Sequence, residues 1–139
     1  MAASTTIPAQ RKRANEVSRM VVTAGMKVHT ALGPGLLENT YRYCLAQELR
    51  NQGLSLHIEV PLPVFYEGTK LEIGYRLDLL VEDLIVVEVK AIEALAPIHS
   101  AQILSYLKLS GKELGLLMNF NTVHLKDGIK RFVLGSGWE

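Results

Sequence analysis

Two charged residues, Glu88 and Lys90, interrupt an otherwise apolar segment, LIVVEVKA (84–91). Its β-branched composition predicts a buried strand, in which alternate side chains point to the same face. Glu88 and Lys90 therefore share a face. Removing two charges from water costs several kcal/mol unless they are paired or coordinated. The two residues either form an ion pair at the end of the sheet, face solvent at a sheet edge, or belong to a chemical site.

Asp78, in the apolar segment before this strand, bears on that choice. A two-residue loop between the two strands would place Asp78 and Glu88 on opposite faces. A three-residue loop (82–84), or a one-residue bulge, pairs Val81 with Ile85 and brings Asp78 opposite Glu88. We predict this second register because it separates apolar from polar side chains. The apolar face would carry Leu77, Leu79, Val81, Ile85, Val87 and Val89, and the polar face Arg76, Asp78, Glu88 and Lys90.

Two facing carboxylates repel each other unless a cation lies between them, so this register predicts a metal site. Oxygen ligands favour Mg²⁺ or Mn²⁺ over zinc. The sequence has no zinc-type pattern, since its four histidines are scattered (29, 57, 99 and 124) and Cys44 is the sole cysteine. Lys90 beside a metal would orient a water and stabilise developing negative charge. Metal-assisted hydrolysis of a phosphodiester is the reaction that this set would serve.

The elements that must position these residues follow from apolar periodicity and from glycine and proline breaks. A helix is expected over 15–32, ended by Gly33-Pro34-Gly35, and a second helix over about 36–52. Strands are predicted at 56–66, 71–81, 84–91, 113–120 and 129–134, with a helix at 97–109. Pro61 and Pro63 restrict the first strand to a sheet edge. The order α-α-β-β-β-α-β-β predicts an α/β fold with a mixed sheet flanked by helices.

The length of 139 residues suits one domain, and 48% hydrophobic with 21% charged residues indicates a globular, soluble chain. Fifteen Lys and Arg against 14 Asp and Glu provide no bulk charge that favours nucleic acid, so any such contact must be local. No apolar run reaches the ~18 residues of a membrane helix. A single cysteine and no secretory signal lead us to expect a cytoplasmic protein. Residues 1–14 are predicted to be a flexible basic arm and residues 15–139 the domain.

The pattern of Asp78 followed by Glu88-Val89-Lys90 resembles the PD-(D/E)XK nuclease superfamily, although Leu77 stands where the superfamily name has proline. Longer segments, among them VHTALGPGLLENTY, GYRLDLLVED and VVEVKAIEALAPIHSAQILSYLKL, look like the GxxExxY family, named for Gly35-x-x-Glu38-x-x-Tyr41. The resemblance covers roughly residues 15–134. It implies a restriction-endonuclease-like core of helix, three antiparallel strands, helix and strand. It also implies a Mg²⁺-dependent (or Mn²⁺-dependent) nuclease that acts on DNA or RNA, with DNA as the preferred expectation.

The same resemblance assigns roles to individual residues. Glu38, Asp78, Glu88 and the backbone carbonyl of Val89 would be the metal ligands, and Lys90 the catalytic lysine. Gln102 and Tyr106 resemble the Gln-x-x-x-Tyr motif of exonuclease-like branches, where they would position a substrate phosphate or a water. Because they are four residues apart on a helix, the two side chains can face one site.

Each of these assignments has a structural alternative. Glu38 is also an ordinary acid at a helix start, Gln102 a helix-flank residue, and Tyr106 a core aromatic. For His29 and Tyr41 the sequence allows either a structural role or a role near the site. Asn119 and Asn121 suit turn hydrogen bonds, whereas Lys126, Lys130 and Arg131 with Arg11, Lys12 and Arg13 form a basic cluster for solvent or phosphate.

The function has alternatives as well. The alternative is a catalytically inactive module of the same fold that binds nucleic acid or protein. An exposed edge strand would also allow a homo-oligomer such as a homodimer.

Overall fold

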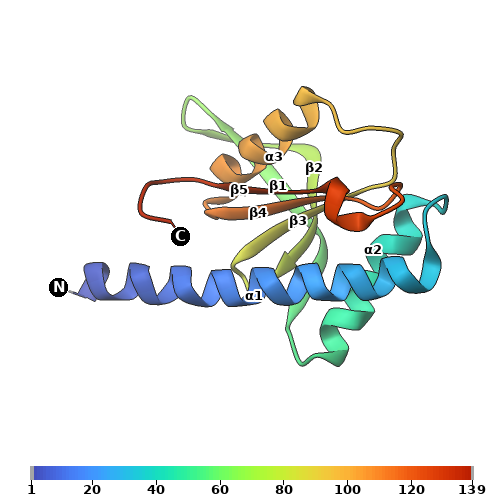
Figure 1. Cartoon of the computed structure of the whole chain (residues 1–139). Coiled ribbons are helices and arrows are strands. Elements are labelled where there is room, and N and C mark those ends of the chain that lie inside the picture. Colours follow the sequence, from blue (N-terminus) through green and yellow to red (C-terminus); the bar gives the residue numbers. More distant parts are fainter. Residues whose placement is uncertain (1, 139) are drawn as a thin grey trace.

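The computed structural model describes residues 2–138, with side chains described from Ile7 onward. Three helices, five strands and a short 3₁₀ helix follow the predicted order (Figure 1). The bounds are α1 Ala2–Leu32, α2 Glu38–Asn51, β1 Leu56–Tyr66, β2 Thr69–Val81, β3 Ile85–Lys90, α3 Pro97–Ser110, β4 Leu114–Asn119, η1 Leu125–Gly128 and β5 Ile129–Val133. The chain is therefore an α/β fold, as predicted.

The five strands form one mixed sheet in the order β1-β2-β3-β4-β5. Neighbouring strands are antiparallel except β3 and β4, which are parallel and are joined through α3. A parallel pair needs such a crossover, and the helical spacing of Ile103 and Leu107 lets α3 bury one side on the sheet. Strand β1, which contains Pro61 and Pro63, lies at the edge as predicted, where missing backbone donors cost least.

Helices cover both faces of the sheet, with α1 and α2 on one side and α3 on the other (Figure 1). The larger core joins α1 and α2 to alternate strand residues, which are Leu79, Val81, Ile85, Val87, Val89, Leu114, Leu116 and Met118. A smaller core packs the opposite face against Leu107 of α3 and contains Leu62, Leu77, Leu80 and Val86. The prediction of a segregated apolar face is confirmed except at Leu77, which belongs to the smaller core because β2 has left β3 at that point.

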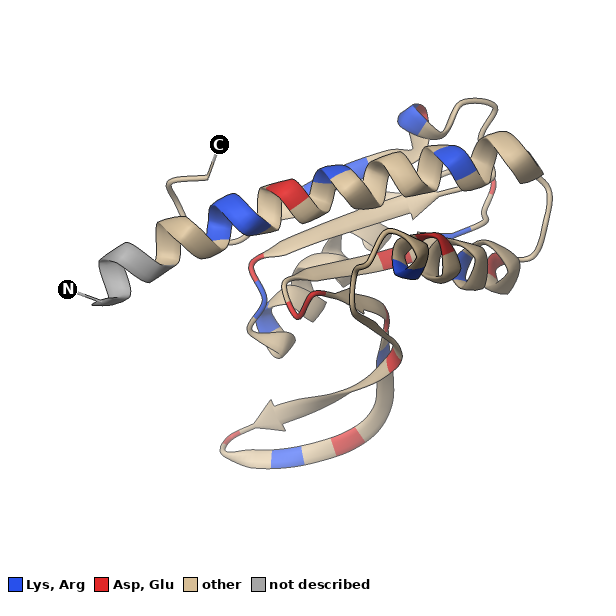
Figure 2. Cartoon of the chain, turned by 90° about the horizontal axis from the view of Figure 1, so that it is seen from below, with Lys and Arg blue, Asp and Glu red and all other residues tan. Residues whose placement is uncertain are grey.

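Helix α1 begins well before the predicted start at Asn15 and continues back to Ala2. Most of the predicted arm is therefore helical. Lys and Arg positions recur along the α1 ribbon, with one acidic position among them (Figure 2). Arg11 accounts for part of the difference, since its guanidinium bonds Glu113 at 2.8 Å and the carbonyl of Ser136. These partners lie more than 100 residues later in the sequence, so no local sequence pattern predicts them.

The register between β2 and β3 is the predicted one. Val81 pairs with Ile85 across a three-residue turn, and the paired residues end with Leu79 and Val87. Beyond that point β2 pairs only with β1, and this hairpin projects away from the body of the molecule (Figures 1 and 2). Continued by one residue, the register places Asp78 opposite Glu88, where the two strands separate.

Candidate active site

Asp78 lies where β2 separates from β3, and its carboxylate takes over the place of a strand partner. The backbone N–H of Val89 donates to Asp78 Oδ2 at 2.8 Å. This bond satisfies a donor of β3 that would otherwise lose its partner as the strands diverge. It also fixes the Asp78 carboxylate, which is partly exposed, beside Glu88.

Glu88 is the most strongly perturbed acid of the described residues. It is 3% exposed, and its Oε1 has no hydrogen-bond partner among the described residues. Burial, and after it the negative charge of Asp78, raises the pKa of Glu88 to about 9. Without a bound cation the Glu88 carboxyl is therefore protonated at neutral pH.

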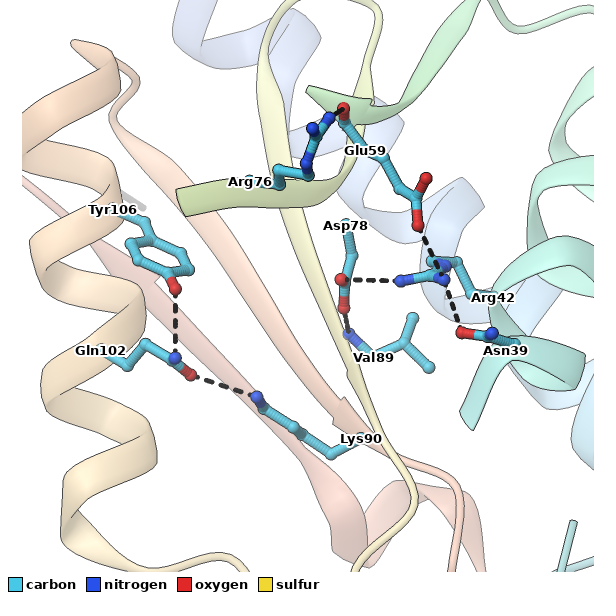
Figure 3. A network of polar contacts seen from close by, with 9 residues as sticks. All are labelled: Asn39, Arg42, Glu59, Arg76, Asp78, Val89, Lys90, Gln102 and Tyr106. Atoms are coloured by element: carbon cyan, nitrogen blue, oxygen red, sulfur yellow. Dashed lines mark hydrogen bonds and ion pairs between the residues drawn. The ribbon is translucent and has the colours of Figure 1, made fainter. Parts of the chain in front are cut away.

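Arg42 is the cation that faces Asp78 in this structure, and sequence reasoning missed it. Its Nη1 lies 3.2 Å from Asp78 Oδ1, and its Nη2 lies 3.1 Å from Glu59 Oε1 and bonds Asn39 (Figure 3). The residue is 7% exposed and its Nε lacks a hydrogen-bond partner in the described part of the chain. Its spacing four residues after Glu38 was the available signal, because residues four apart share a helix face.

Glu38 is the first residue of α2 and responds to the same charges. Burial raises the pKa of Glu38, and the Asp78 carboxylate raises it further, whereas Lys90 and Arg42 oppose these effects. The structure thus brings Glu38 within electrostatic range of the residues grouped with it by sequence. Leu37 provides no side-chain cap, so the acid at this helix start also complements exposed backbone N–H groups.

Tyr41 determines how the loop before α2 closes, which answers the choice left open for this residue. Its hydroxyl donates to the carbonyl of Gly33 at 2.5 Å and accepts from the N–H of Leu36 at 3.0 Å. Its ring is fully buried and stacks on Phe120. Tyr41 therefore supports the loop that precedes Glu38, and its hydroxyl is used there.

Lys90, Gln102 and Tyr106 form a hydrogen-bonded row from β3 to α3. Lys90 Nζ donates to Gln102 Oε1 and Gln102 Nε2 donates to the Tyr106 hydroxyl, each at 3.1 Å (Figure 3). Burial, together with the charge of Glu88, raises the pKa of Tyr106. The i, i+4 spacing on α3 thus brings both side chains to one face of the helix, toward Lys90, whereas their role at a site stays a prediction.

Other candidates have structural roles. His29 is buried and its Nε2 lies 2.8 Å from the carbonyl oxygen of Thr122. Asn119 accepts from the N–H of Ile92 and donates to the carbonyl of Ile92, which fixes the turn after β3. Arg76, placed by sequence on the polar face, reaches the carbonyl of Glu59 instead.

The residues present fit a divalent cation at Asp78 and Glu88 in their chemistry. The unpartnered Oε1 of Glu88 is a buried acceptor that a cation would satisfy, and the acids would then ionise. As the described side chains lie, they contain no group of three or more His, Cys, Asp or Glu residues able to hold a metal ion. In this structure Arg42 Nη1 lies 3.2 Å from the Asp78 Oδ1 atom.

Comparison with known proteins gives one finding. A family model described as the PD-(D/E)XK nuclease superfamily matches residues 15–132. Comparisons with curated proteins and with solved structures returned no match. No helix in the described part of the chain combines the length and the apolarity needed to cross a membrane.

Proposed function

This chain belongs to the PD-(D/E)XK nuclease superfamily, and we propose that it is a nuclease that hydrolyses phosphodiester bonds with Mg²⁺ or Mn²⁺. The observation that carries the proposal is the buried Glu88 beside the partly buried Asp78 where β2 leaves β3, with Lys90 two residues beyond Glu88 on the same strand. Glu88 is buried with an unpartnered oxygen, and its charged form is costly there unless it is paired or coordinated.

Asp78, Glu88 and the Val89 carbonyl are the proposed ligands, with Glu38 as the third acid. A divalent cation there would neutralise charge on the phosphodiester and activate a water. The protein contributes a fixed Asp78, because the Val89 N–H holds one of its oxygens. It also contributes a Glu88 whose carboxyl is protonated until a cation binds, so loading would release a proton.

Lys90 is the residue proposed to stabilise negative charge on the phosphoryl oxygens and to orient the attacking water. Gln102 holds its ammonium group at 3.1 Å, and Tyr106 in turn accepts from Gln102. These bonds restrict an otherwise flexible side chain before substrate arrives. We assign Gln102 and Tyr106 the role of positioning Lys90 and the scissile phosphate.

We also propose that the chain is a GxxExxY protein and that DNA is its substrate in preference to RNA. The motif residues support the first point through structure: Tyr41 holds the glycine-containing loop, and that loop places Glu38 at the start of α2. Substitution of Tyr41 or of Glu38 should therefore disturb the candidate active site.

The test is a nuclease assay of the purified chain on single- and double-stranded DNA and RNA, with Mg²⁺, with Mn²⁺ and with a chelator. Lys90→Ala should lower the cleavage rate at least about a hundredfold, which is the usual contribution of a positioned acid–base group. Lys108→Ala is the matched control, because Lys108 is exposed on α3. Salt-dependent binding without cleavage by any metal would contradict the proposal and indicate an inactive binding module.

A further inference from the structure

A groove of about 1070 Å³ lies between the N-terminal half of α1 and the end of the chain that follows β5. Residues 7–23 of α1 form one wall, and Arg131 of β5 and Trp138 of the C-terminal segment contribute to the other. Figure 1 shows this half of α1 and the C-terminus at one end of the molecule, with α2 at the other end. The groove is therefore separate from the candidate active site.

The charged side chains that line this groove are all basic. Arg11, Lys12, Arg19 and Arg131 line it, and no Asp or Glu does. The whole chain carries a net charge of only +1, so this cluster of basic side chains is a local feature of the surface. Lys12 and Arg19 are exposed and have no ion-pair partner among the described residues, whereas Arg11 is partly neutralised by Glu113.

The groove is built from fixed parts. Trp138 Nε1 donates to the carbonyl of Leu134 at 3.0 Å, which ties the C-terminal segment to the residue that follows β5. The guanidinium carbons of Arg11 and Arg131 lie 4.9 and 5.7 Å from the centroid of the Trp138 ring. Arg131 also donates to Asn15 on α1 at 2.7 Å. These contacts hold two arginines in position beside an aromatic ring before any ligand binds.

The dimensions and chemistry suit an extended polyanion. Seventeen residues of α1, from 7 to 23, span roughly 25 Å, which is the length of about seven phosphates along one B-form strand. Apolar side chains also line the groove, among them Val22 and Ile129, where they could contact sugars or bases. Phosphate contacts from Lys and Arg supply position and affinity without reading sequence.

We propose that this groove binds a nucleic-acid strand through its phosphates, at a site separate from the catalytic residues. Binding there needs neither a metal nor a catalytic step. The groove proposal can therefore be tested independently of the nuclease proposal. For an active nuclease the groove would hold a distant part of the same strand.

The experiment uses Trp138, the only tryptophan of the chain, as a reporter inside the groove. Its fluorescence is titrated with a 20-nucleotide single-stranded DNA and with ATP, in EDTA so that no metal-dependent cleavage occurs. Arg19→Gln and Lys12→Gln each remove one groove cation. Arg50→Gln removes the same charge from the exposed C-terminal turn of α2 and is the control. Thermal unfolding checks that all variants fold.

We expect saturable quenching by DNA and a dissociation constant that rises with salt. Each phosphate contact on a single strand contributes about 0.7 to the slope of log K against log salt. Arg19→Gln and Lys12→Gln should therefore each weaken binding about fivefold at 0.1 M salt, and Arg50→Gln should not. Equal effects of all three variants, no change in Trp138 fluorescence, or saturation by ATP with none by DNA would each overturn the proposal.

Discussion

Replacing Glu88 by glutamine should stabilise the metal-free protein at neutral pH. The carboxyl of Glu88 is nearly fully buried, and its pKa is raised from 4.5 to about 9 by burial and by Asp78. Between these two values the folded state holds a proton that the unfolded state has released. Stability from this group is therefore full below pH 4.5 and is lost as the pH rises through about 9.

The magnitude follows from the slope of about 1.4 kcal/mol per pH unit for one proton. At pH 7 the solution is 2.5 units above the ordinary pKa of 4.5, so keeping Glu88 neutral costs about 3 kcal/mol. Glutamine has nearly the same shape as the protonated acid and never ionises. Glu88→Gln should therefore exceed the wild type in unfolding free energy by about 3 kcal/mol at pH 7 and by little at pH 4.5.

Urea unfolding followed by circular dichroism at both pH values, with EDTA present, measures this difference. Glu93→Gln is the control, since Glu93 is exposed in the loop after β3. A loss of stability in Glu88→Gln at both pH values, or a gain that is equal at both, would refute the reasoning. Added Mn²⁺ should remove most of the difference at pH 7, because a ligand at a hundred times its dissociation constant stabilises the wild type by about 2.7 kcal/mol and the variant lacks the Glu88 carboxylate.

Three further substitutions test the scaffold of the site. Tyr41→Phe should cost about 1–2 kcal/mol in unfolding free energy, because two backbone groups of the loop before α2 lose their partner, and it should slow cleavage with little change in secondary structure. Gly128→Ala should cost about 2–3 kcal/mol, since the added Cβ would lie 2.3 Å from the carbonyl oxygen of Asn119; thermal unfolding measures both variants. The hydrogen bonds from Ser55 lower the pKa of Glu82, so the stability from Glu82 is present above pH 4.5 and lost as the pH falls. Glu82→Ala should therefore lower unfolding free energy at pH 7 more than at pH 3, and an equal loss at both would contradict this assignment.

The sequence predicted the sheet and the meeting of Asp78 with Glu88 because side-chain alternation strongly restricts register. Only one loop length places the apolar residues of β2 and β3 on a common face, and the structure has that loop. The exception is Leu77, which joins the core under α3. Its position depends on where β2 leaves β3, and local alternation carries no information about that point.

The spacing of Arg42 from Glu38 could have placed it on the site face of α2, but not its partners. Its contacts with Glu59 and Asp78 join residues 17 and 36 positions apart, which a helix-face pattern does not reveal. The same holds for α1, whose early start involves contacts with the far end of the chain. By contrast, the spacing of Gln102 and Tyr106 is local to one helix and predicted that both would lie on one helix face, which their hydrogen bonds to each other and to Lys90 follow; their role at the site stays a prediction.

A crystal structure of the wild type grown or soaked with Mn²⁺ tests the central claim most directly. An anomalous difference peak should lie between Asp78 and Glu88, with oxygen distances of about 2.0–2.6 Å, and Glu38 should reach it directly or through a water. Arg42 should then have moved from the Asp78 oxygen that it contacts at 3.2 Å in this structure. Mn²⁺-containing crystals with no peak there, and with Arg42 still on Asp78, would contradict the assignment of these carboxylates as a metal site.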